Sequence, residues 1–249
     1  MTALLLALIA GAVVGLALGA LGGGGSVLAV PALIYLLGFS PAAATTAGLI
    51  IVTATSLTAL YAHARTGQVR WKAGAAFAAA GILPAAAAGA VAARLPQAVL
   101  TGAFAVVAGL AAVKMFRPAV TARPASGDVR PGKSAAAGAG LGTLTGLLGV
   151  GGGFLAVPAL VTVLAFEMEA AVGTSLLVIT VNSLASLATR SGAAASLDRA
   201  VIGPFIAAAI LGAWDGKRLA AKVSGPRLQR VFAAVLLAVA AFMLADAVM

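Results

Sequence analysis

The chain of 249 residues has no cysteine and few charged side chains. The lack of cysteine excludes disulfides, thiol redox chemistry and thiolate metal sites. Charged residues make up 9% of the chain, against roughly 25% in a soluble domain, while 62% of its residues are hydrophobic. A chain of this composition cannot cover a surface that faces water. The sequence therefore predicts an integral membrane protein.

Acidic residues are scarcer than basic ones, with six Asp and Glu against 16 Lys and Arg. Such an excess can indicate nucleic-acid binding, but these basic residues lie in short connections between apolar runs, where they orient a chain in the membrane. We expect the lipid bilayer as a partner and no nucleic acid. The apolar runs reach about 20 residues, the length of a helix that spans a bilayer. The predicted class is an all-α polytopic membrane protein.

Residues that would support catalysis or metal binding are also lacking. The Walker A pattern of ATP-binding proteins does not occur. His63 is the single histidine, and we expect it at the cytoplasmic interface. Glu167, Glu169 and Asp215 are the acidic residues worth testing for a role inside the membrane, although their places near segment ends favour an interfacial role. We expect no enzymatic activity, no metal and no cofactor.

The second half of the chain repeats the first. The stretch GGGGSVLAVPAL at 22–33 aligns with GVGGGFLAVPAL at 149–160, and a slightly larger offset later aligns Phe77 with Phe205. Gene duplication is the economical explanation, so we predict two homologous repeats joined by a polar cytoplasmic link. Their bounds are 1–116 for repeat 1, 117–134 for the link and 135–249 for repeat 2.

Each repeat contains five apolar pieces in the same order. They lie at 3–21, 26–38, 43–62, 73–93 and 97–116, and again at 135–148, 153–166, 170–189, 200–214 and 228–247. Basic clusters follow the third piece of repeat 1, fill the link, and follow the fourth piece of repeat 2. If all are cytoplasmic, each repeat crosses the membrane an odd number of times and the repeats are inverted. Arg190 and Arg199 are exceptions that this arrangement places outside. Whether 26–38 and 153–166 cross the bilayer or re-enter stays open.

The runs of consecutive glycine should break a helix, because each glycine costs about 1 kcal/mol relative to alanine. Inverted repeats with broken helices form a transporter architecture in which half-helix N-termini point at the substrate near the midplane. Such an end has unpaired N–H groups and a positive dipole, which favour an anion. We expect the short helices to begin at Ser26 and Gly153. The predicted substrate contacts of the runs are Gly23, Gly24, Gly25, Ser26, Gly151, Gly152 and Gly153.

Glycines upstream of each run recur at every fourth position, which is the spacing of a close helix contact. We predict a packing role for Gly11, Gly15, Gly19, Gly138, Gly142 and Gly146. Pro31 and Pro158 come too late in their short helices to occupy the first turn, so we expect them to kink these helices.

The third piece of each repeat carries many hydroxyl groups. Several of these should bond to their own helix backbone, while others, with one amide, could line an anion route. The candidates for substrate contact are Thr53, Ser56, Thr174, Ser175 and Asn182.

At these motifs the chain resembles the sulfite exporter TauE/SafE family of membrane permeases. The resemblance rests on the two glycine-rich stretches, on AVGTSLLVI at 171–179 and on the duplicated layout, and it covers nearly the whole chain. Repeat 1 departs from the pattern, since Thr46-Ala47-Gly48-Leu49 stands where repeat 2 has GTSL. The resemblance implies transport of sulfite or small organosulfonates across the bacterial inner membrane, commonly outward.

The resulting hypothesis is a secondary transporter that moves a small sulfur oxyanion by alternating access between the two repeats. Protons are a candidate coupling ion, and the protonation of the anion itself is one way to couple them. A passive anion channel of the same fold and a non-transporting membrane subunit are the alternatives. Counterflow distinguishes a carrier from a channel, because substrate on the opposite side accelerates the flux through a carrier but not through a channel. A homodimer is left open.

Overall fold

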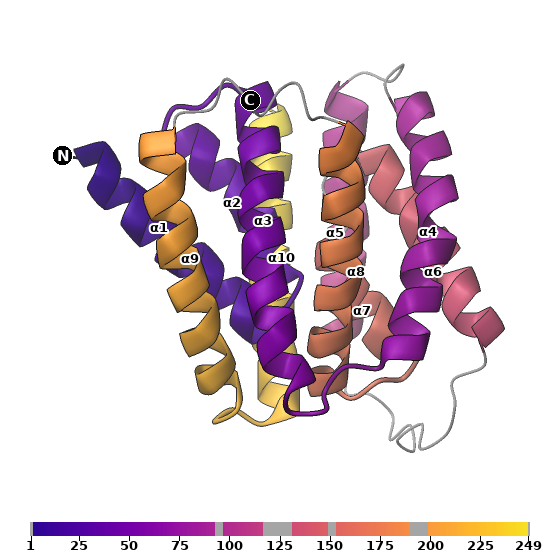
Figure 1. Cartoon of the computed structure of the whole chain (residues 1–249). Coiled ribbons are helices and arrows are strands. Elements are labelled where there is room, and N and C mark those ends of the chain that lie inside the picture. Colours follow the sequence, from indigo (N-terminus) through magenta and orange to yellow (C-terminus); the bar gives the residue numbers. More distant parts are fainter. Residues whose placement is uncertain (1, 93–96, 117–130, 149–152, 190–198, 249) are drawn as a thin grey trace.

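The computed structural model describes residues 2–92, 97–116, 131–148, 153–189 and 199–248, and this part of the chain is helical (Figure 1). Repeat 1 forms α1 (Thr2–Leu21), α2 (Gly24–Pro31), a π-helix η1 (Ala32–Leu36), α3 (Pro41–Ala64), α4 (Trp71–Ala92) and α5 (Gln97–Phe116). Repeat 2 forms α6 (Pro131–Leu148), which begins within the predicted link 117–134, and then α7 (Gly153–Thr162), α8 (Met168–Thr189), α9 (Arg199–Ala220) and α10 (Gly225–Val248). The prediction of an all-α fold is confirmed, while the bounds of the two repeats stay a prediction.

Among the described residues, five helical segments are long and apolar enough to cross a bilayer. They are Leu4–Leu21, Thr46–Ala64, Met168–Leu187, Ala200–Ala220 and Gly225–Phe242. Large apolar side chains such as Leu83 and Leu211 are exposed, as expected where lipid rather than water covers the bundle. These observations agree with a polytopic membrane protein.

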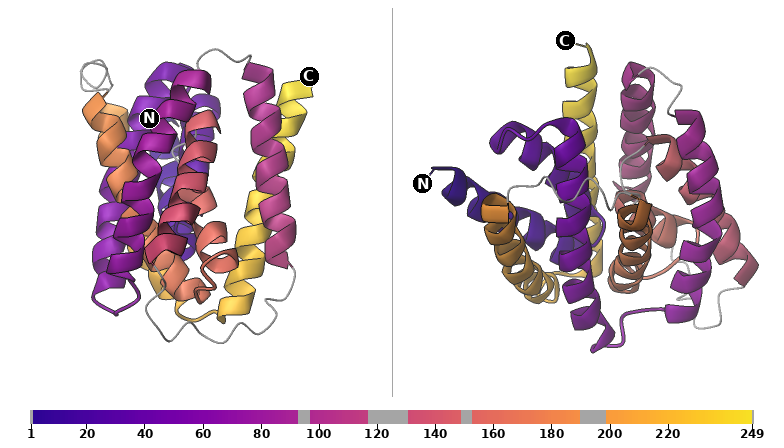
Figure 2. Two further views of the ribbon diagram at one scale, coloured as in Figure 1. Left: turned by 90° about the vertical axis from the view of Figure 1, so that its right-hand side faces the viewer. Right: turned by 45° about the horizontal axis from the view of Figure 1, so that its top comes forward.

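The helix contacts of one repeat recur in the other. The first helix of each repeat packs along the fourth helix of the other, α1 on α9 and α6 on α4. Equivalent elements also meet directly, with α3 against α8, α2 against α7, and α5 beside α10 (Figure 2). The four elements α2, α3, α7 and α8 therefore form the centre of the bundle, where both repeats contribute equally.

The spaced glycines make the two long crossed pairs possible. A Cβ atom on Gly15 would overlap the backbone of Ala209 on α9, and a Cβ on Gly142 would overlap the backbone of Gly81 on α4. Gly11, Gly19 and Gly138 face the partner backbone in the same way, whereas the surroundings of Gly146 lie outside the described residues. The predicted packing role is confirmed for Gly11, Gly15, Gly19, Gly138 and Gly142, and it stays a prediction for Gly146.

The glycine-rich break in repeat 1 is shorter than the sequence suggests. Gly22 has a φ of 66° and ends α1, and α2 begins at Gly24 after Gly23. The expectation that this helix begins at Ser26 is wrong, because the later glycines adopt ordinary helical angles. Helix α7 does begin at Gly153, while Gly151 and Gly152 lie outside the described residues. Helices α2 and α7 are short, with 8 and 10 residues, whereas α1 and α6, which precede them, have 20 and 18.

The two prolines align by the repeat offset but lie at different places in their short helices. Pro31 is the last residue of α2, and the chain continues directly as the π-helix η1. Proline lacks an N–H group and its ring crowds the carbonyl one turn earlier, which disfavours a regular helix at this point. Pro158 lies inside α7.

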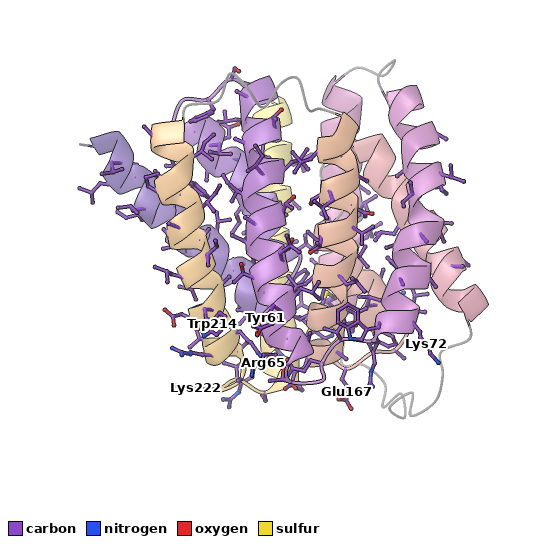
Figure 3. All side chains as sticks on the ribbon, in the orientation of Figure 1. Tyr61, Arg65, Lys72, Glu167, Trp214 and Lys222 are labelled. Atoms are coloured by element: carbon purple, nitrogen blue, oxygen red, sulfur yellow. The ribbon has the colours of Figure 1, made fainter. Side chains whose placement is uncertain are left out.

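One end of the bundle carries Arg65, Lys72 and Lys222, and we name it the basic end (Figure 3). Helix α3 finishes at this end just before Arg65, whereas α8 starts there just after Glu167. The basic residues that follow the third piece of repeat 1 and the fourth piece of repeat 2 thus lie at the same end, as the charge pattern requires.

Candidate functional site

The break between α1 and α2 lies directly against α8 of the other repeat. A Cβ atom on Gly22 would lie 2.6 Å from Ser175 Oγ and 3.2 Å from the carbonyl oxygen of Val172. Its positive φ is a second reason for glycine, since side chains disfavour that backbone region. The turn is therefore fixed in place by repeat 2. Of the predicted contacts, Gly23 follows this turn and is buried.

The start of α2 follows at once with Gly24, Gly25 and Ser26. The first N–H groups of a helix have no partner within it, so this end supplies the type of donor that the sequence predicts for an anion. The side-chain surroundings of these three residues lie outside the described part of the chain.

Most hydroxyl groups at the interface of α3 and α8 donate to backbone carbonyls one turn earlier. Thr53 Oγ1 donates to the Leu49 carbonyl at 2.7 Å, and Ser175 Oγ donates to the Val172 carbonyl at 2.8 Å. Ser56 Oγ lies 3.2 Å from the Thr53 carbonyl. A hydroxyl has one proton to donate, so these groups cannot at the same time donate to an anion. Three of the five predicted polar contacts are thus held by their own helices.

One hydroxyl pair joins the two repeats. Thr180 Oγ1 of α8 lies 3.0 Å from Ser56 Oγ of α3 and 2.7 Å from the Leu176 carbonyl oxygen, and its single proton serves one of these acceptors at a time. Both side chains are buried. The pair lies well inside both long helices, so it ties the repeats together within the apolar region.

Three polar side chains of α8 have no hydrogen-bond acceptor among the described residues. Thr174 is 0% exposed and accepts a hydrogen bond from the Arg70 N–H at 3.0 Å, but its own hydroxyl has no acceptor in the described part of the chain. Asn182 is half-buried, and Ser183 is buried; neither has a hydrogen-bond partner among the described residues. A buried hydroxyl without a partner is costly, so a ligand or water should satisfy it.

Ser183 is absent from the residues predicted as substrate contacts. The sequence offered one indication of its importance, its alignment with the predicted contact Ser56. The two serines differ in the structure, because Ser56 contacts Thr180 of the other repeat. Thr174, Asn182 and Ser183 all belong to repeat 2. The repeat offset aligns them with Ala47, Thr55 and Ser56. Ala47 has no polar side-chain group, and the hydroxyls of Thr55 and Ser56 contact backbone carbonyls of their own helix.

The acidic side chains do not form a buried relay in the described part of the chain. Asp215 pairs with Arg218 at 3.5 Å on a surface where both side chains are about two-thirds exposed, and Glu167 and Glu169 are also exposed. No group of three potential metal ligands occurs among the described residues. The positions of Glu167, Glu169 and Asp215 near helix ends agree with the interfacial role expected from the sequence.

The helical pairs, the broken helices and the two like repeats define a polytopic α-helical membrane protein of the transporter class. A family model described as sulfite exporter TauE/SafE matches residues 7–243. The chain belongs to this family, as the resemblance in its motifs predicted.

Two relatives carry the name "Probable membrane transporter protein", one from Xylella fastidiosa strain 9a5c and one from strain Temecula1 / ATCC 700964. Each is 33% identical to this chain over 242 residues, which cover 94% of this chain and 92% of the relative. No solved structure matches the chain. Family and relatives together agree on membrane transport.

Proposed function

We propose that the protein is a secondary transporter that exports a small sulfur oxyanion, sulfite or an organosulfonate, across the bacterial inner membrane. The family description supports the substrate class. The basic end would lie in the cytoplasm, following the preference of Lys and Arg for that side. A passive channel remains the alternative, and acceleration by substrate on the opposite side distinguishes the carrier.

The observation that carries the proposal is the contact of the α1–α2 turn with α8. Gly22 of repeat 1 fits against Ser175 of repeat 2 with no room for a side chain, so the turn that leads into α2 lies against α8. The proposed site combines the N–H groups at the start of α2 with hydroxyl donors of α8. This combination suits an oxyanion because it supplies several donors and a positive dipole without a buried cation.

Alternating access is supported by the exchange of contacts between the repeats. We infer that the repeats are inverted, because α3 ends at the basic end where its counterpart α8 begins. A carrier of this kind moves one set of elements against the other around a fixed central site. The centre formed by α2, α3, α7 and α8 would be that site.

The test compares two serine variants in proteoliposomes loaded with sulfite. Ser183→Ala removes a buried hydroxyl with a free proton, whereas Ser175→Ala removes one that already donates to Val172. Loss of one hydrogen bond to a charged ligand costs about 1.5–3 kcal/mol, so Ser183→Ala should raise the sulfite concentration for half-maximal efflux by roughly tenfold or more. Ser175→Ala should stay close to the parent.

Equal effects of the two variants would show that free hydroxyl protons do not bind the anion. No sulfite efflux by the folded parent would refute the substrate, and the same assay should then be run with organosulfonates. Efflux that is not accelerated by sulfite on the opposite side would indicate the channel.

A further inference from the structure

The basic end contains a buried polar cluster that joins three elements. His63 lies in the last turn of α3 and is 4% exposed. Its Nδ1 lies 2.7 Å from Gln68 Oε1 in the connection to α4, and its Nε2 lies 3.3 Å from the carbonyl oxygen of Gly19 in α1. His63 thus lies at the basic end, near the interface where the sequence places it, but the folded chain encloses its side chain.

Gln68 extends the cluster into repeat 2. Its Nε2 donates to Glu169 Oε2 in the first turn of α8 at 3.3 Å, which leaves its Oε1 to face the imidazole. The same connection lies tightly on α8, because a Cβ on Gly173 would be 2.7 Å from the Gln68 carbonyl oxygen. Together His63, Gln68 and Glu169 form a chain of side chains from α1 to α8.

Both ring nitrogens of His63 face oxygen acceptors. A neutral imidazole carries one N–H group, whereas the imidazolium carries two. The neutral ring therefore leaves either the Gln68 oxygen or the Gly19 carbonyl without a donor. Only a protonated His63 satisfies both contacts at once.

The charged groups that act on His63 are few. Glu169 of α8 and Lys217 of α9, which donates to the neighbouring carbonyl of Ala62, are the ionisable groups that face it. Helix α1 contributes a carbonyl oxygen through Gly19. Burial of the ring disfavours a charged imidazolium, and the pairing of both ring nitrogens with oxygen acceptors offsets that cost.

The cluster has no equivalent in the other half of the sequence. The repeat offset places Arg190 opposite His63, Ala42 opposite Glu169 and Gly89 opposite Lys217. Arginine does not lose its proton in proteins, and the other two positions are not ionisable. A proton at His63 would therefore act at one end of the transporter and not at the other.

We propose that His63 is a proton-binding site whose occupancy holds the basic end closed. A bound proton ties α1, the α3–α4 connection and α8 together, and its loss weakens that tie so that the connection can leave α8. This inference rests on the proposed transport function, because a closing end has a role only in a protein with a transport path. It makes opening of this end sensitive to pH on its own side.

The absence of cysteine allows a direct accessibility test. Val69, which lies in the connection and is 7% exposed, is replaced by cysteine, and the exposed Lys222 is replaced in a separate reference chain. A hydrophilic thiol reagent is applied to both purified proteins in detergent from about pH 5 to about pH 8, the range in which histidine titrates. Dividing the Val69→Cys rate by the Lys222→Cys rate removes most of the intrinsic pH dependence of the thiol.

We expect the normalised rate to rise at least about tenfold with increasing pH, the factor that corresponds to losing one hydrogen bond to a charged group. His63→Gln should give a rate that is high and independent of pH. Gln68→Ala should raise the rate at acidic pH, since it removes the link to Glu169. Gln229→Ala is the matched control, because this glutamine joins α10 to α5 through the Met115 carbonyl at 2.8 Å, away from the cluster.

A flat profile in the parent, or an unchanged pH dependence in His63→Gln, would overturn the proposal. If His63→Gln does not fold, Gln68→Ala provides the test. A labelling rate in Gln68→Ala that depends on pH as in the parent would then overturn the proposal. The assay uses no substrate, so failure of sulfite transport leaves it interpretable. Transport with a flat labelling profile would refute the proton site alone.

Discussion

The crossing of α1 and α9 makes a sharp prediction for Gly15. A Cβ at this position would lie 2.6 Å from both the carbonyl carbon and the Cα of Ala209. Carbon atoms in good contact are about 3.5–4.0 Å apart, so the helices would have to separate by about 1 Å. The obstructing atoms belong to backbone, and no side chain can rotate away to relieve the overlap.

Gly109 in α5 provides the matched control, because a Cβ there meets nothing within 4 Å. Both substitutions to alanine gain the same helix propensity, about 1 kcal/mol, so their difference isolates packing. Overpacking costs about 1–3 kcal/mol. We therefore expect Gly15→Ala to be less stable than Gly109→Ala by that amount.

The assay is thermal unfolding in detergent, followed by circular dichroism. A difference of about 1–3 kcal/mol corresponds to a Tm lower by roughly 2–12 °C for Gly15→Ala than for Gly109→Ala. Equal Tm values for the two variants would refute the close approach of α1 and α9. The same comparison with Gly142→Ala examines the equivalent crossing of α6 and α4.

Two further substitutions separate buried from exposed interactions. Thr180→Val keeps the side-chain shape but removes the buried hydroxyl that contacts both Ser56 and the Leu176 carbonyl, so chemical denaturation should show a loss of about 1 kcal/mol; an unchanged midpoint would argue against a stabilising role of this hydroxyl. Arg218→Ala removes an exposed i,i+3 pair with Asp215, so its Tm should stay within about 4 °C of the parent, since such pairs contribute about 0–1 kcal/mol.

Local features of the sequence determined the helical pieces and their order. Apolar runs bounded by glycine, proline and charge marked the ten pieces, because a chain in lipid must satisfy its backbone hydrogen bonds within helices. The recurrence of GGGGSVLAVPAL at 22–33 also predicted the duplication. Glycines at every fourth position showed that α1 and α6 have a close contact face, but not that α9 and α4 are the helices that meet it.

Only the tertiary structure decided which polar groups are available for a ligand. The hydroxyls of Ser175 and Ser183 look alike in the sequence, yet one donates to its own helix and the other has no partner among the described residues. The sequence likewise predicts His63 as an interfacial residue, whereas in the structure its ring contacts the carbonyl of Gly19, which is distant in the chain. Helix propensity and hydropathy act over a few residues and can be read from the chain. The partner of a buried polar group depends on which distant backbone lies within about 3 Å of it, and that is settled by packing.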